Sequence, residues 1–159
     1  SNQMGMAKFC AGDYEEALKK FADSLAIWQD IDDTPGMTQA LNNIGSTYFA
    51  LNETNAAMEA FEEALELQRS VLLNYFGISQ RECINQSDDK DIQSAFTSLS
   101  KILCNMAYIY NATASSASCT AARHFVEESL SIQVALSRGP PPEDRIIDIL
   151  SELTHSDTF

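Results

Sequence analysis

Histidines, cysteines and paired acids are the residues of this chain that could do chemistry. The two histidines, His124 and His155, have no aspartate or glutamate placed by the sequence to orient them, and no glycine-rich phosphate loop is present. Paired acids recur along the chain, at 15–16, 32–33, 62–63, 88–89 and 127–128. Because the pairs at 62–63 and 127–128 fall at corresponding places in similar segments, we interpret them as a solvated helix face. The sequence therefore predicts that this is not an enzyme.

Metal binding is not predicted either. The four cysteines form no C-x-x-C pair, neither histidine lies at ligand spacing from a cysteine, and the acids do not follow the calcium-loop pattern. We therefore expect no metal, no other cofactor, and reduced, mostly buried thiols, which are typical of the cytoplasm. No signal peptide opens the chain. Because the chain begins at Ser1 within a helical pattern, we interpret it as a fragment that lacks its targeting region.

The net charge restricts the partners. The 159 residues include 23 acids and 10 lysines and arginines, which gives a net charge of −13. Such a charge repels nucleic-acid phosphates and anionic membrane surfaces, and no apolar run reaches the roughly 20 residues that span a bilayer. We expect a protein or peptide partner that is neutral to basic, with no nucleic acid and no direct membrane insertion. The length and the apolar fraction of 45% predict one globular domain over residues 1–159.

An internal repeat organises the first half of the chain. Each unit reads as a pair of helices, because apolar residues recur at helical spacing on both sides of a turn. Corresponding residues lie 40 positions apart, a spacing that chance similarity would not maintain. The matched pairs are Gly5 and Gly45, Ala17 and Ala57, Phe21 and Phe61, Ser24 and Ala64, and Leu25 and Leu65.

Local signals place the helix ends within the repeats. Asp13 can cap the helix that follows it, with Glu16 as its capping-box partner. In the next turn, Thr34 suits an N-cap and Pro35 suits the first helical position. A small residue at Gly45 allows two helix axes to approach closely, while aromatic residues fill the gaps between them.

The second repeat carries a recognisable pattern. It reads Leu41-x2-Ile44-Gly45-x2-Tyr48, followed by Ala57-x3-Phe61. This pattern resembles the tetratricopeptide repeat family. The long period and the asparagine pair at 42–43 resemble the repeats of kinesin light chains and the Pins/LGN adaptors. The resemblance implies an all-α, right-handed superhelix, in which the first helices of successive pairs line a concave groove that binds ligands.

On this basis we expect about three antiparallel helix pairs and a C-terminal capping helix. Repeat 1 covers about 1–33, repeat 2 about 34–73, an insertion about 74–98, a degenerate repeat 3 about 99–137, and the terminal helix about 142–153. We expect repeat 2 to end in an extended helix, followed by a loop near 77–90 and a lengthened helix from about 91. The insertion is either an ordinary loop or a docking element formed by Leu72, Tyr75 and Phe76.

Helical spacing also predicts which side chains face the groove. They lie opposite the packing stripe of the first helices in repeats 2 and 3. An asparagine amide donates and accepts hydrogen bonds, so a row of them can hold an extended peptide backbone without reading charge. The alternative is that these asparagines join neighbouring helices. The predicted groove residues are Gln39, Asn42, Asn43, Ser46, Phe49, Lys101, Asn105, Tyr108 and Asn111.

One subclass of the family clamps the carboxylates of chaperone tails, and this chain fits it poorly. Asn43 and Lys101 match two of the five clamp positions. Asn2, Met6 and Asn105 occupy the other three, without the required lysine, asparagine and arginine. We therefore do not expect a chaperone-tail clamp.

The resulting prediction is a protein–protein interaction module that scaffolds an assembly or docks a peptide in its groove. Two alternatives remain open. The chain is a structural subunit held in a large complex through its convex face and its insertion, or it is a regulatory fragment of a larger multidomain protein.

Overall fold

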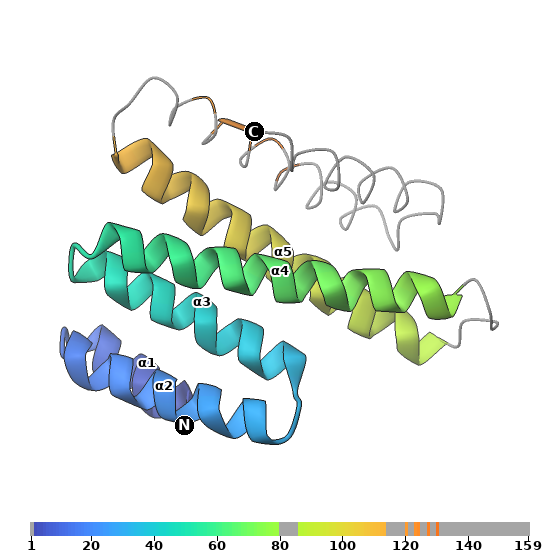
Figure 1. The fold of residues 1–159 in the computed structure, drawn as a ribbon, viewed down its shortest axis with the longest axis horizontal. Coiled ribbons are helices and arrows are strands. Elements are labelled where there is room, and N and C mark those ends of the chain that lie inside the picture. Colours follow the sequence, from blue (N-terminus) through green and yellow to red (C-terminus); the bar gives the residue numbers. More distant parts are fainter. Residues whose placement is uncertain are drawn as a thin grey trace.

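Five helices lie within residues 2–79 and 86–113 of the chain. The computed structural model describes residues 2–79 and 86–113 and positions 120, 123, 124, 127 and 130, without the side chains of 73–79, 86–89 and 92. Helices that follow one another in sequence pack together in antiparallel pairs (Figure 1). No strand occurs within these described ranges, and the predicted all-α class is confirmed. The helices are α1 (Asn2–Cys10), α2 (Tyr14–Asp30), α3 (Thr34–Ala50), α4 (Thr54–Ser79) and α5 (Gln86–Ala112).

The first three turns between helices share one backbone conformation. Each has a left-handed residue at its centre, with φ of 80° at Gly12, 56° at Asp32 and 62° at Asn52. Glycine, asparagine and aspartate are the residues that adopt this conformation at the least cost. In each turn the next amide donates to the carbonyl five residues earlier, which satisfies an orphan carbonyl of the preceding helix. These bonds are Asp13 to Lys8 at 3.0 Å, Asp33 to Trp28 at 2.9 Å and Glu53 to Tyr48 at 2.9 Å.

The helix caps differ in detail from the predicted ones. Asp33, not Thr34, is the N-cap of α3, and its Oδ1 accepts a hydrogen bond from the Gly36 amide at 3.4 Å. Asp13 occupies the predicted N-cap position of α2, but its side chain makes no capping bond. Its carboxylate instead pairs with the Lys8 ammonium at 2.9 Å. The nearby cation therefore replaces the capping box that the sequence predicts.

A phenylalanine ring on a helical glycine joins the helices of the α1–α2 and α3–α4 pairs. A Cβ atom added at Gly45 would lie 2.9 Å from Cε2 and Cζ of Phe61, and one added at Gly5 would overlap the ring of Phe21. Both rings are fully buried. Because a side chain larger than hydrogen would hold the helices apart, the glycines permit the close approach. The predicted equivalence of the two repeats, and the predicted role of Gly45, are confirmed.

The α4–α5 hairpin is longer than the others and extends past the α2–α3 turn (Figure 1). A buried amide links its two helices, because Gln68 Nε2 donates to the Ala95 carbonyl at 2.9 Å. The predicted extension of both helices is present, but the boundaries of the predicted loop at 77–90 are wrong. α4 continues to Ser79 and α5 starts at Gln86. Apolar residues on both helices, including the buried Phe96, support the additional turns.

Other predictions fall largely outside the described residues. The second helix of repeat 3 is represented by five positions between 120 and 130, all helical and exposed. The expected terminal helix at 142–153 lies outside the described part. The handedness of the superhelix and the repeat boundaries stay predictions.

Candidate functional site

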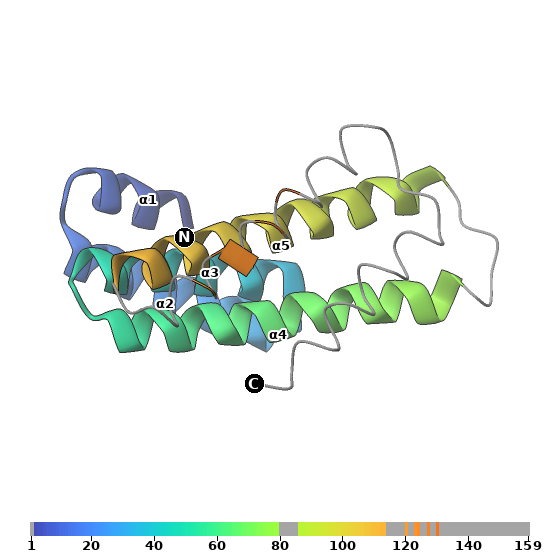
Figure 2. The same ribbon diagram turned by 90° about the horizontal axis from the view of Figure 1, so that it is seen from above.

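The predicted groove residues lie on the accessible side of two adjacent helices. α3 contacts α5, and seen from above α1 and α5 lie on one side of the molecule and α4 on the other (Figure 2). The opposite sides of α3 and α5 are buried, as Leu41 and Leu103 show. Four of the nine side chains are exposed and five are partly buried. The exposed ones are Gln39, Lys101, Tyr108 and Asn111; the partly buried ones are Asn42, Asn43, Ser46, Phe49 and Asn105.

A side-chain hydrogen bond joins the two helices across this surface. Asn105 Nδ2 donates to Asn42 Oδ1 at 2.9 Å. The bond therefore corresponds to the alternative in which the asparagines join neighbouring helices. An amide has two donor hydrogens and one acceptor oxygen, so this bond does not exhaust the pair. The NH2 group of Asn42 and the Oδ1 atom of Asn105 remain as a neighbouring donor and acceptor.

An aromatic pair continues the same surface towards the C-terminal ends of α3 and α5. The rings of Phe49 and Tyr108 meet edge to face, with centroids 5.5 Å apart and an interplanar angle of 79°. This is a favourable aromatic geometry. Phe49 is partly buried, whereas Tyr108 is 66% exposed, so one ring supports the other and leaves it open to solvent. The structure thus brings together residues that are 59 positions apart.

Two hydroxyl groups of α3, one at this surface and one in the buried interior, are bonded within the helix. Ser46 Oγ donates to the Asn42 carbonyl at 3.0 Å, and Thr47 Oγ1 donates to the Asn43 carbonyl at 2.7 Å. The Ser46 hydroxyl can still accept a hydrogen bond, because its oxygen keeps its lone pairs. Ser46 therefore contributes less to a binding surface than the sequence predicts.

An exposed thiol on this surface was missed by the sequence prediction. Cys104 lies on α5, three residues after Lys101 and four before Tyr108, and it is exposed. Residues at these spacings are neighbours on a helix surface, so the same periodicity could have found it. Cys10 on α1 is also exposed. The expectation of mostly buried cysteines is wrong for these two residues.

One of the three residues of the possible docking element, Leu72, does not have the exposed position that docking requires. Leu72 is fully buried in the main core cluster, next to residues of α5. It therefore supports the long hairpin and is not available to a partner. The side chains of Tyr75 and Phe76 lie outside the described residues, although their backbone belongs to α4.

Charge around the groove is unevenly distributed. Lys101 is the one basic residue among the nine predicted positions, and acids cover the exposed side of α4. Partial burial raises the pKa of Tyr110 above its ordinary value of 10.0, and the negative charge of Glu62 raises that pKa further. Glu62 on α4 therefore lies close enough to α5 to act on it electrostatically.

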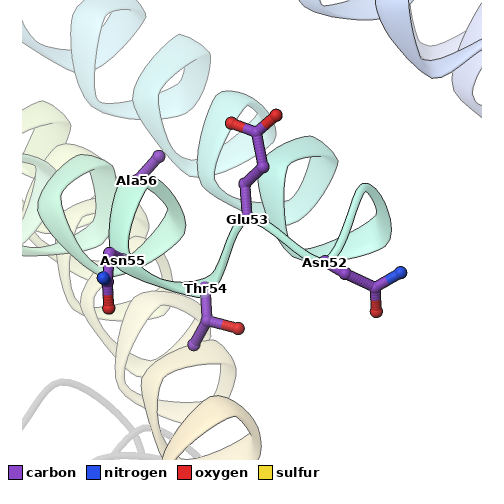
Figure 3. Close-up of a pocket in the computed structure, with 5 residues that line it drawn as sticks. All are labelled: Asn52, Glu53, Thr54, Asn55 and Ala56. Atoms are coloured by element: carbon purple, nitrogen blue, oxygen red, sulfur yellow. The ribbon is translucent and has the colours of Figure 1, made fainter.

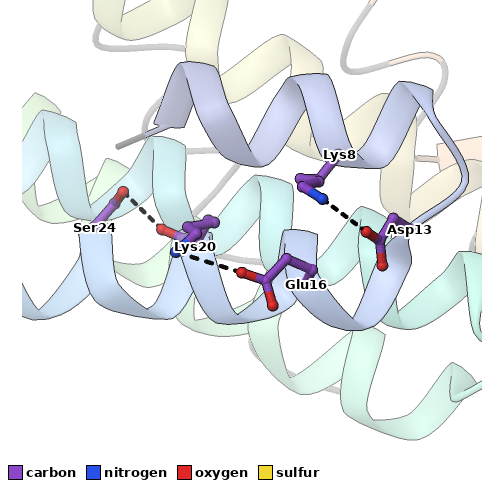
Figure 4. Close-up of polar contacts among 5 residues, drawn as sticks. All are labelled: Lys8, Asp13, Glu16, Lys20 and Ser24. Atoms are coloured by element: carbon purple, nitrogen blue, oxygen red, sulfur yellow. Dashed lines mark hydrogen bonds and ion pairs between the residues drawn. The ribbon is translucent and has the colours of Figure 1, made fainter.

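A second polar cluster joins α1 and α2 (Figure 4). The hydrogen bond and the charge of Asp13 raise the pKa of Lys8 above 10.5. Lys20 pairs with Glu16 at 3.4 Å, and Ser24 Oγ donates to the Lys20 carbonyl at 2.9 Å. Each partner lies within one or two helical turns of the other. We interpret this cluster as local support for the α1–α2 pair.

A surface depression lies at the α3–α4 turn (Figure 3). Five consecutive residues, 52–56, line it, and none comes from another helix pair. Figure 3 shows Asn52 and Glu53 pointing in different directions. Because no side chains converge there, the depression is a weaker candidate than the α3–α5 surface.

Groups for catalysis are sparse in the part of the chain that the structure describes. It contains no cluster of three histidines, cysteines or acids that could hold a metal ion. His124 is exposed, and His155 lies outside the described residues. No helix among the described residues has the length and apolar character needed to cross a membrane.

Comparison with known proteins identifies the helix pairs. A family model for the tetratricopeptide repeat matches residues 1–70, which cover α1 to α3 and much of α4. No curated protein and no solved structure matched the chain. Tetratricopeptide repeats are non-enzymatic modules that mediate protein–protein interactions by binding proteins or peptides. The likeness to the kinesin light chains and Pins/LGN stays a prediction. With its glycine–phenylalanine helix pairs and this match, the segment 1–70 belongs to the tetratricopeptide repeat family.

Proposed function

We propose that the α3–α5 surface binds an extended peptide segment of a partner protein. The observation that carries this proposal is the bond between Asn42 and Asn105, which fixes two amides side by side. Their remaining donor and acceptor match the C=O and N–H of a peptide unit. Because the amides are already held, less side-chain entropy is lost on binding.

The aromatic pair supplies an apolar contact beside this polar pair. Tyr108 lies three residues, about 4.5 Å of helix rise, from Asn105. An extended chain advances about 3.3 Å per residue, so an apolar side chain one or two residues from the held peptide unit can rest on Tyr108. The support from Phe49 keeps the ring in place. A large, rigid aromatic surface of this kind is typical of residues that dominate binding energy.

The charge of the partner follows from the surroundings. The net charge of −13 disfavours an acidic segment. The amides and the aromatic ring of the surface are themselves uncharged and do not require a charged partner. We therefore expect an uncharged or basic segment. The exposed thiols of Cys10 and Cys104, neither of them in a disulfide, also favour a reducing compartment such as the cytoplasm.

Selection from a library of linear peptides tests the proposal. Peptides selected on the unaltered chain should bind Asn42→Ala or Tyr108→Ala at least about tenfold more weakly, a loss of about 1.4 kcal/mol. Asn55→Ala, which removes an exposed asparagine near the start of α4, is the matched control and should bind normally. Circular dichroism should show the same helix content in all variants. If the peptides bind Asn42→Ala and Tyr108→Ala as tightly as they bind the unaltered chain, the proposal is refuted.

Alkylation of thiols locates the bound peptide independently. Cys104 lies one helical turn from Tyr108, so a peptide on this surface should slow its reaction with a maleimide. Cys10 on α1 provides the control and should react at an unchanged rate. Protection of Cys10 without protection of Cys104 would place the peptide elsewhere.

A second candidate function has one observation in its favour. Ile27 and Ile31, one turn apart at the end of α2, are both more than half exposed. Such a pair on the second helix of a repeat fits a fixed contact between neighbouring subunits. If this function is correct, Ile27→Lys should release the chain from its complex while peptide binding to the α3–α5 surface is unaffected.

A further inference from the structure

The aromatic end of the α3–α5 surface presents an open ring face. Tyr108 is 66% exposed and meets Phe49 edge to face, with ring centroids 5.5 Å apart. In an edge-to-face pair the second ring covers at most one face of the first, so a face of the Tyr108 ring stays open to solvent. The face of an aromatic ring carries partial negative charge and attracts a cation that is placed over it.

Both helices of the surface end beside this aromatic pair. Phe49 lies in the last turn of α3, and Tyr108 lies one turn before the end of α5 at Ala112. The C-terminal end of a helix carries partial negative charge, which a lysine or arginine in the last turn can balance. Neither α3 nor α5 has a basic residue in its last turn. The negative ends of these two helices are therefore not balanced by their own side chains.

The charges around the helix ends differ between α1 and α5. The last turn of α1 contains Lys8, whose ammonium pairs with the carboxylate of Asp13. At the end of α5, burial raises the pKa of Tyr110, and the negative charge of Glu62 raises that pKa further. A carboxylate on α4 thus adds to the negative potential at the C-terminal end of α5.

The other end of the surface carries a positive charge. Lys101 is exposed and lies seven residues before Tyr108, about 10.5 Å of helix rise. Lys101 also lies four residues before Asn105, on the other side of the amide pair. A basic side chain of a bound peptide would therefore be repelled at the Lys101 end and attracted at the Tyr108 end. This charge pattern determines on which side of the held peptide unit a basic residue can lie.

We propose that the α3–α5 surface selects a peptide with an arginine that rests on Tyr108, a preference that rests on the peptide binding proposed above. The guanidinium lies over the open face of the ring, beside the negative ends of α3 and α5. The aliphatic stem of the arginine supplies the apolar contact with the ring. Arginine fits better than lysine because its planar, weakly hydrated group stacks on aromatic faces. The arginine lies one or two residues from the peptide unit held by Asn42 and Asn105.

Citrulline has nearly the shape of arginine without its charge, so it isolates the contribution of the cation. The probes are linear peptides that are selected from a random library on the unaltered chain and resynthesised with a fluorescent label. Arginine should recur at one position, and its replacement by citrulline should weaken binding about tenfold in fluorescence polarisation. Tyr108→Phe keeps the aromatic face and should bind the arginine peptide normally. Tyr108→Leu removes that face and should bind the arginine and citrulline peptides equally weakly.

The possible outcomes separate this preference from peptide binding itself. Selected peptides without a recurring arginine would overturn the preference, as would equal affinity of the unaltered chain for the arginine and citrulline peptides. A tenfold loss with citrulline that persists in Tyr108→Leu would also overturn it. If Asn42→Ala still weakens binding in these cases, the proposed peptide binding stands and only the arginine preference fails. If Asn42→Ala has no effect, or if no peptide is selected, both proposals fail.

Discussion

Replacement of Gly45 by alanine tests the packing on which the helix pairs depend. The added Cβ would lie 2.9 Å from two atoms of the Phe61 ring, closer than such contacts occur in proteins. Phe61 is 1% exposed, so its ring has little room to move away. The Gly45→Ala change therefore forces the ring, or the α3–α4 spacing, to shift.

Two opposing effects determine how much Gly45→Ala changes the free energy of unfolding. Alanine in place of glycine within a helix stabilises by about 1 kcal/mol. Overpacking a buried site costs about 1–3 kcal/mol. We expect Gly45→Ala to lower the free energy of unfolding by up to about 2 kcal/mol, which is the difference between these two contributions. In a Phe61→Leu background the ring atoms Cε2 and Cζ are gone, so Gly45→Ala should raise that free energy by about 1 kcal/mol.

Urea unfolding of the four chains in this double-mutant cycle measures both effects. Circular dichroism follows the helices, and the fluorescence of Trp28, the one tryptophan, follows the α2–α3 pair. The expected coupling free energy between Gly45 and Phe61 is about 1–3 kcal/mol. If Gly45→Ala stabilises the original chain as much as the Phe61→Leu chain, the close contact does not exist and the reasoning fails.

Two other predictions concern the α4–α5 pair. Gln68→Leu should lower the free energy of unfolding by about 1 kcal/mol, since it removes the hydrogen bond to the Ala95 carbonyl at similar side-chain volume; urea unfolding checks this, and an unchanged midpoint contradicts it. The raised pKa of Tyr110 means that the folded chain holds the phenolic proton of Tyr110 more tightly than the unfolded chain does. The contribution of the protonated Tyr110 to the free energy of unfolding is therefore present below pH 10 and is lost as the pH rises further. Glu62→Gln should lower that pKa in a spectrophotometric tyrosinate titration, and no change would show that Glu62 does not act on Tyr110.

Much of the fold could be predicted because its determinants are local or periodic. The 40-residue spacing of Phe21 and Phe61 identified the repeat, and both rings occupy equivalent buried sites. The cap of α2 could not be predicted in full, because Asp13 had two competing partners within reach. The sequence shows Glu16 at capping-box spacing, but the Lys8 ammonium comes close only when α1 folds back on α2.

The candidate site was predictable as a surface but not as a set of contacts. Helical periodicity places Asn42 and Asn105 on accessible faces, yet only the packing of α3 against α5 brings their amides within 2.9 Å. Likewise, only this helix packing brings the rings of Phe49 and Tyr108 into contact. The sequence alone could not decide whether Leu72 packs or docks, because an apolar residue at the end of a repeat can face either solvent or a longer partner helix. The length of α5 decides this, and it lies in another part of the sequence.

The shared conformation of the turns at Gly12 and Asn52 has a consequence for engineering. These two residues are 40 positions apart and have nearly the same φ. Excision of everything from Asp13 to Asn52 would join Gly12 directly to Glu53 and preserve the backbone path at the junction. The shortened protein would keep a glycine facing a phenylalanine, now Gly5 and Phe61. The architecture is thus divisible into interchangeable blocks, with a splice point that the chain already contains.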